Sequence, residues 1–195
     1  MRRHNTGFLC ILCGLAVSCV PWTVVPIEEE QTTASAAGDA QAYVDSIWGS
    51  RLLPAAREHA VDLATAKARH ERGSGSHFFV AGTGRVVSLD ESSRSGKLLI
   101  DLDPGDGQPD AALLVGPVIL GSAVRDAAGF IEFSQFVNQL AYADVANELN
   151  RRVLDTVLAP IDLKTLPGKT VRFCGAWSPA GEALSEIVPL VLEVE

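Results

Sequence analysis

The chain has 195 residues, of which 47% are hydrophobic and 21% charged. This length and apolar content are enough for one hydrophobic core, which excludes a wholly disordered chain and favours a single globular domain. The formal net charge is −8, and an acidic surface repels phosphate backbones, so nucleic acid is not an expected partner.

Residues 1–19 have the pattern of a bacterial export signal, with a basic start, an apolar run over 8–17 and small residues before Cys19. The segment Leu15-Ala16-Val17-Ser18-Cys19 resembles the lipobox of bacterial lipoproteins, although Ala16 departs from the usual leucine. That resemblance implies that the leader is removed and that Cys19 becomes the lipid-modified N-terminus. Loss of Arg2 and Arg3 then leaves 14 of the 16 basic residues against 24 acidic ones, a charge of −10.

Two other outcomes for the leader stay open. Residues 8–27 contain no charge over 20 positions, which is long enough for an uncleaved transmembrane anchor, although Pro21 and Pro26 interrupt the second half. Ordinary secretion with cleavage is the third possibility. All three place the globular part in the cell envelope, facing the periplasm or the exterior.

Two helices are expected over residues 39–76, after a solvated tether over 20–38. The first covers about 40–49, where apolar residues recur at three-and-four spacing. The second opens at Leu53-Pro54, where proline suits the first helical turn, and ends at a Gly-Ser linker over 73–76.

Residues 77–195 predict a barrel of five strands with one long amphipathic helix, spanning at least Tyr142 to Val157, between the third and fourth strands. Gly82 and Gly84 should let the long first strand bend sharply. This order is that of an OB-fold, so we predict an α+β, OB-fold-like five-stranded barrel preceded by two helices. An open α+β sheet is the alternative. The expected strands are 77–89, 96–103, 111–120, 169–177 and 186–194.

No arrangement of a nucleophile with a base is evident, so we expect neither an enzyme nor a cofactor. Ser76-His77 is not a nucleophile elbow, because the predicted helix precedes the serine and the strand follows it. Cys174 lies in the middle of a predicted strand, as a small buried residue would.

One acidic loop is a weak candidate for calcium binding. Its oxygen ligands alternate near a glycine, but the spacing exceeds that of an EF-hand by one residue and no bidentate glutamate follows. The alternative is a plain acidic hairpin loop with no metal. The candidate residues are Asp101, Asp103, Asp106 and Asp110.

The candidate binding residues are the polar pairs Arg125-Asp126 and Asn138-Gln139, which flank an aromatic loop over 130–136. The loop is too apolar to lie freely in water, so it should fold back over the barrel and bring the two pairs together. Under a structural interpretation these groups bond to the backbone and cap the long helix. Under a ligand interpretation they line a pocket for a sugar or a carboxylate.

The stretch that contains these pairs also resembles a known family. The similarity rests on Gly116-Pro-Val-Ile119, Arg125-Asp126, Phe130-Ile131, Phe136-Val-Asn-Gln139 with Tyr142, Val20-Pro-Trp-Thr23, Ser93-Arg-Ser-Gly96 and Gly168-Lys-Thr-Val171. Together they resemble a family of predicted periplasmic lipoproteins with a domain of unknown function, whose members are often encoded beside sugar-type ABC importers.

The resemblance implies a lipid-anchored envelope protein that works with a solute-uptake system and brings no catalytic residues. The binding of a partner protein, such as an importer component, is therefore the first functional hypothesis. A small-molecule binder is the second, and an enzyme is the third.

Overall fold

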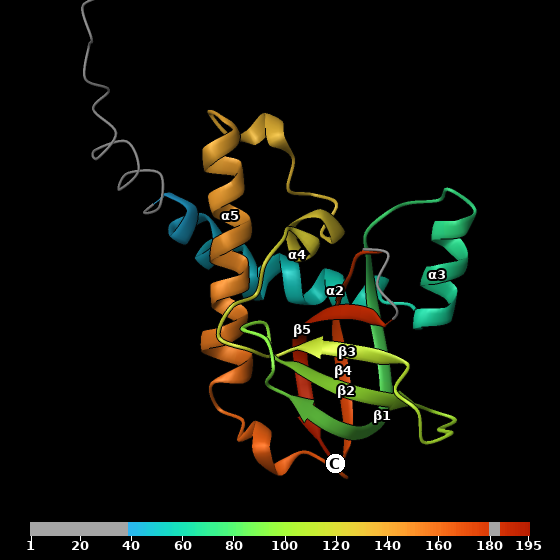
Figure 1. Ribbon diagram of the computed structural model, residues 1–195. Helices are drawn as coiled ribbons and strands as arrows, with labels where there is room; N and C mark the ends of the chain where they lie inside the picture. Colours follow the sequence, from blue (N-terminus) through green and yellow to red (C-terminus); the bar gives the residue numbers. More distant parts are fainter. Residues whose placement is uncertain (1–38, 180–183) are drawn as a thin grey trace, which may run out of the picture.

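The computed structural model describes residues 39–179 and 184–195 (Figure 1). Cys19, the predicted lipidation site, and the rest of the leader and tether lie outside these residues. No helix within the described ranges is both long and apolar enough to cross a membrane.

Five strands close into one barrel in the order β1-β2-β3-β5-β4, with β4 returning to β1. The helical segment between β3 and β4 includes the long helix α5 (Figure 1). The predicted OB-fold-like architecture is therefore confirmed, and the open-sheet alternative is wrong. The strands are β1 (Phe78–Asp90), β2 (Lys97–Leu102), β3 (Ala111–Leu114), β4 (Thr170–Trp177) and β5 (Ser185–Val194).

The long strand β1 pairs with a different neighbour along each of its two halves. Its first part pairs with β4 from Phe78 to Arg85, and its second part pairs with β2 from Gly84 onward. A Cβ on Gly84 would lie 2.4 Å from the carbonyl oxygen of Asp101, so only glycine permits this approach of the two backbones. Gly84 is thus required by the close packing of β1 against β2, and the register irregularity of β1 falls farther along, between Val86 and Ser88. That the glycine pair bends the strand stays a prediction.

The third strand is shorter than predicted, because it ends at Leu114 and not at Leu120. Beyond it, Val115 and Gly116 donate backbone hydrogen bonds to Gly96 and Ser95, which belong to the turn between β1 and β2. A Cβ on Gly96, whose φ is +45°, would lie 2.8 Å from the Cα of Gly116. This backbone contact at the turn takes the place of the expected strand pairing.

The N-terminal helices divide at a different place from the one predicted. Residues 39–59 form one helical run through η1 (Trp48–Leu52) and α2 (Leu53–His59), and α3 covers Leu63–Glu71. The break falls at 60–62 because the Val61 amide donates to Phe79 O (3.1 Å) and Val61 O accepts from Ala81 N (3.0 Å). Val61 thus extends the sheet beside β1, and Asp62 begins the next helix by capping Thr65.

Helix α5 (Gln139–Arg152) continues into η3 (Val153–Leu158) and stands beside the barrel (Figure 1). Its predicted apolar stripe is buried at Val145, Leu149 and Val153. Three short helices complete the described segments: α4 (Ala123–Ala127), η2 (Phe133–Gln135) and η4 (Leu163–Thr165).

Candidate functional site

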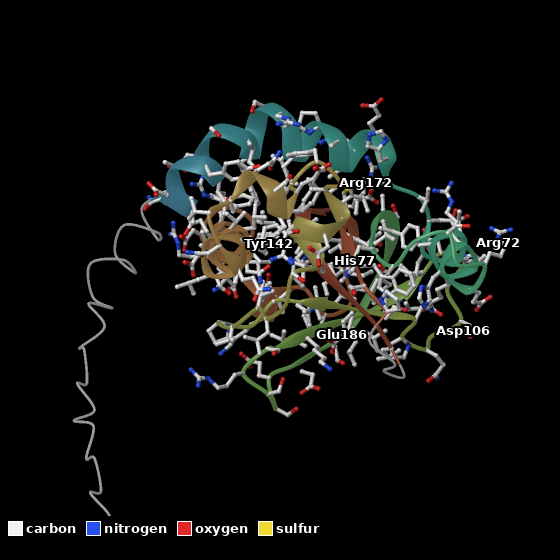
Figure 2. The ribbon with its side chains drawn as sticks, turned by 90° about the horizontal axis from the view of Figure 1, so that it is seen from above. Arg72, His77, Asp106, Tyr142, Arg172 and Glu186 are labelled. Carbon is white, nitrogen blue, oxygen red and sulfur yellow. The ribbon has the colours of Figure 1, made fainter. Side chains whose placement is uncertain are left out.

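The predicted polar corner is a compact cluster on α4. The Arg125 guanidinium donates to Asp126 Oδ1 from Nε (2.8 Å) and to the Tyr142 carbonyl from Nη1 (3.1 Å). It also stacks on the Tyr142 ring, 3.7 Å from the ring centroid. Ser122 Oγ donates to the other carboxylate oxygen of Asp126 at 2.6 Å. In Figure 2, Tyr142 and His77 lie in the central part of the molecule, near α4.

The polar groups of this cluster are hydrogen-bonded to neighbouring protein atoms. The side chains of Arg125 and Asp126 are 12% and 20% exposed, and the contacts above engage the donors of Arg125 and both oxygens of Asp126. The cluster therefore fixes α4 against α5, and a ligand would have to displace existing bonds to use it.

The second polar pair lies one turn before Tyr142. Asn138 is the N-cap of α5, and its Oδ1 accepts from Ala141 N at 2.8 Å, which confirms the structural interpretation for this residue. Gln139 is exposed at the first position of the helix. Ligand binding by Arg125, Asp126, Asn138 and Gln139 stays a prediction.

Ser76, His77 and Asp126 lie near one another and are the three residue types of a hydrolase catalytic triad. Ser76 Oγ lies 3.0 Å from His77 Nδ1, and His77 Nε2 lies 3.6 Å from Asp126 Oδ2. The second distance is too long for a hydrogen bond, and Asp126 is already engaged by Arg125 and Ser122. The geometry does not orient His77 as a base for Ser76.

The carboxylates of the acidic loop bond mainly to its own backbone. Asp101 is buried, and its two oxygens accept from Asp106 N (3.1 Å) and Gly107 N (2.8 Å). Asp110 Oδ2 accepts from Leu102 N at 2.9 Å. Among the described residues, no group of three or more His, Cys, Asp or Glu side chains is placed to hold a metal ion. These contacts suit the hairpin-loop alternative.

A groove that the sequence did not predict lies on the outer face of β1, β4 and β5, beside the end of α2. Its volume is about 490 Å³. The sheet register puts Ala81, Cys174 and Val191 in one row as the floor, with Thr83, Arg172 and Glu193 in the next row. The groove is lined by Arg57, Ala60, Ala81, Gly82, Thr83, Arg172, Phe173, Cys174, Val191 and Glu193.

The groove combines an apolar floor with a charged rim. Burial raises the pKa of the Cys174 thiol, with Arg57 acting in the opposite sense, and Sγ lies 3.5 Å from Ala56 O. The cysteine is therefore a neutral part of the floor. Arg57, Arg172 and Glu193 are exposed, and Arg172 pairs with Glu195 at 3.1 Å. Figure 2 shows Arg172 close to the α2 ribbon.

Sequence reasoning missed the groove because its parts come from four segments that are separated along the chain. The only local signal is the alternation of outward residues along the last two strands, where Arg172 and Glu193 fall next to small or apolar positions. Such alternation also describes any solvated strand face.

Comparison with known proteins gives one family and one fold neighbour. A crystal structure of an OB-fold protein from Thermotoga maritima is similar, with a TM-score of 0.63, 18% sequence identity, and coverage of 80% of this chain and 98% of that chain. At this identity the similarity shows the fold alone. No curated protein matches the chain. The model of the family described as predicted periplasmic lipoprotein (DUF2291) matches residues 9–193, so the chain belongs to this family of the cell envelope.

Proposed function

We propose that the protein is a non-enzymatic binding component of the cell envelope, anchored through Cys19, that serves as an accessory to a solute uptake system. The observation that carries the proposal is the open groove between α2 and the β1–β4–β5 face. The polar corner, by contrast, is internally bonded.

The groove suits a segment of a partner protein. Sites for small molecules are mostly enclosed, whereas this groove has exposed charged residues on its rim. Its neutral floor can accept an apolar side chain. Arg57 can bind a nearby carboxylate, and Arg172 can do so by exchanging its exposed ion pair with Glu195. The expected occupant is therefore a segment that carries one apolar and one acidic side chain.

The link with sugar uptake comes from the family resemblance, since its members are often encoded beside sugar-type ABC importers. An importer component is accordingly the partner we expect at the groove. The non-enzymatic character is supported by the 3.6 Å separation of His77 from Asp126 and by the other bonds of that carboxylate.

Site-specific photo-cross-linking in intact cells tests this proposal. A photo-reactive residue replaces Thr83 at the groove, and the control carries it at Arg72, an exposed position just beyond α3 (Figure 2). We expect an importer component to be captured and identified from Thr83 and not from Arg72. Capture of another envelope protein would retain the binding role and reject the uptake link. Equal capture from both positions, or none, would reject the groove.

A second candidate function is the binding of a small carboxylate or sugar, by a protein that an uncleaved N-terminal helix anchors. The two exposed arginines on the groove rim favour it. A thermal-shift screen with sugars and carboxylates discriminates it, because a true ligand should raise Tm in the parent and not in Arg172→Ala.

A further inference from the structure

Three large apolar side chains are exposed at the start of α5. Phe133 and Leu140 are each 49% exposed, and Val137 is 93% exposed. Phe133 lies on η2, Val137 in the bend that follows it and Leu140 on the first turn of α5, at the end of the helix that is uppermost in Figure 1. We call these three residues the tip patch. A cluster of this kind on a protein surface commonly marks an interaction site.

The surroundings of the tip patch are polar but carry almost no charge. Residues 133–143 contain no Asp, Glu, Lys or Arg, in a chain that is 21% charged. The neighbours of the three apolar residues are instead Ser, Gln and Asn. Amide and hydroxyl groups cost less to remove from water than charged groups do, and they can keep hydrogen bonds to lipid headgroups, although exposed Glu132 borders the patch.

The tip patch is held outward on a fixed frame. Phe136 packs on Tyr43 and Tyr142, with ring centroids 5.2 and 5.4 Å apart, and Phe133 packs edge-on against Tyr142 at 5.6 Å. Glu132 and Gln135 form a capping box across η2. These contacts hold the residues before Val137, whose own side chain is left in solvent.

The tip patch also lies beside the first helix of the described chain, which follows the tether from the predicted anchor. Tyr43 stands on the first helical turns of the described chain, and its hydroxyl donates to Gln135 Oε1 at 3.1 Å. The described chain begins at residue 39, and only residues 20–38 separate it from Cys19. Nineteen residues span at most about 65 Å when fully extended. The patch therefore lies beside the first helix after the predicted anchor, and a tether of this length lets it reach the membrane that carries Cys19.

We propose that the tip patch inserts into the surface of the phospholipid bilayer that carries the anchor. A projecting group of Phe, Val and Leu side chains fits a soft apolar boundary, whereas a protein partner would need a matching pocket. Neighbouring Asn138 and Gln139 then face the headgroups. The inference rests on the anchoring at Cys19 in the proposed function and is independent of the groove and its partner.

The lipidated protein, reconstituted in phosphatidylethanolamine–phosphatidylglycerol vesicles, provides the test. Intact mass first establishes the lipid on Cys19, and an environment-sensitive fluorophore is attached to Val137→Cys. The native Cys174 is buried and should not compete for the label. The control label sits on Gln108→Cys, in the exposed loop between β2 and β3, away from the tip (Figure 1). We expect emission from the Val137 site to shift to shorter wavelength and to be quenched by nitroxide lipids, with no change at Gln108.

The second part of the test places a negative charge in the tip patch. Leu140→Glu should fold, because an acidic residue in the first turn suits the helix dipole, but it should abolish both the shift and the quenching at the Val137 site. Asn147→Glu adds the same charge to an exposed position farther along α5 and should leave both signals intact. A Val137 label that stays in water like the Gln108 label would overturn the inference. Protection only after addition of membrane proteins would overturn it in favour of a protein interface. Neither result affects the cross-linking test at Thr83.

Discussion

Asn150 ties α5 to the segment that follows β3, and its removal should weaken the whole fold. The side chain is only 4% exposed. Its Nδ2 donates to the carbonyl oxygen of Ile119 at 3.2 Å and to that of Gly121 at 2.9 Å. These bonds join positions that are about thirty residues apart, so they hold tertiary structure and not the helix alone.

The size of the effect of Asn150→Ala follows from the two carbonyls. Ile119 is 7% exposed, so its carbonyl loses a partner where water has little access, at a cost of about 1–3 kcal/mol. Gly121 is exposed, and water can replace the lost bond at a cost of roughly 0.5 kcal/mol. Alanine recovers about 0.5 kcal/mol as a better helix former. The free energy of unfolding should therefore fall by about 2 kcal/mol.

Urea unfolding followed by tryptophan fluorescence measures this loss, since Trp177 is buried in the barrel. Asn147→Ala is the matched control, because it is the same substitution one turn earlier on the exposed face of α5. It should change stability by less than about 0.5 kcal/mol. If Asn150→Ala unfolds at the same urea concentration as Asn147→Ala, the two hydrogen bonds of Asn150 contribute nothing measurable to stability and the reasoning is refuted.

Three further predictions concern single contacts. Asn138→Ala removes the cap of α5 and should cost about 1 kcal/mol in urea unfolding, while Gln139→Ala should cost nothing measurable; equal midpoints would exclude the capping role. Gly84→Ala should lose more than about 3 kcal/mol or fail to fold, because its Cβ would force β1 from β2. Gly49 has open space around it, so Gly49→Ala should raise the free energy of unfolding by up to about 1 kcal/mol, measured by thermal unfolding. Equal losses of stability in the two glycine variants would contradict the packing argument. The bonds from Thr65 lower the pKa of Asp62 in the folded state, so its stabilising contribution is present above the unfolded pKa of about 3.9 and is lost as pH falls through the lower folded value. The stability difference between the parent and Asp62→Ala should therefore shrink on acidification below that range, and a pH-independent difference would exclude the linkage.

Local patterns were sufficient to predict the barrel but not the ends of its elements. The apolar stripe of α5 depends only on its own segment, and this prediction is confirmed. The third strand was predicted too long because apolar alternation looks the same whether or not the backbone pairs. Its true end depends on the contact of Gly116 with Gly96, which is twenty residues away. The helix break at Val61 likewise depends on its pairing with Val80.

The candidate sites show the same division between local and distant information. The cap at Asn138 was predicted because a cap needs only the next three residues. The partner of Arg125 is the ring of Tyr142, seventeen positions along the chain, and no spacing rule identifies it. The groove needs residues from α2, β1, β4 and β5 at once, so it could be found only after the barrel was closed.

The helical run over 39–59 relates the two proposed surfaces, because one end of it touches the tip and the other lines the groove. Tyr43 near its start packs on Phe136, and Arg57 near its end lies on the groove rim. Fourteen residues would rise about 21 Å in an α-helix, and this is an upper limit for the separation along the run because Trp48–Leu52 is a π-helix. With the tip patch on the bilayer, the groove would be held up to roughly that distance from the membrane, past the headgroups. A membrane-bound tip would therefore also set the height and the orientation of the groove, which a tether of nineteen residues alone would not do.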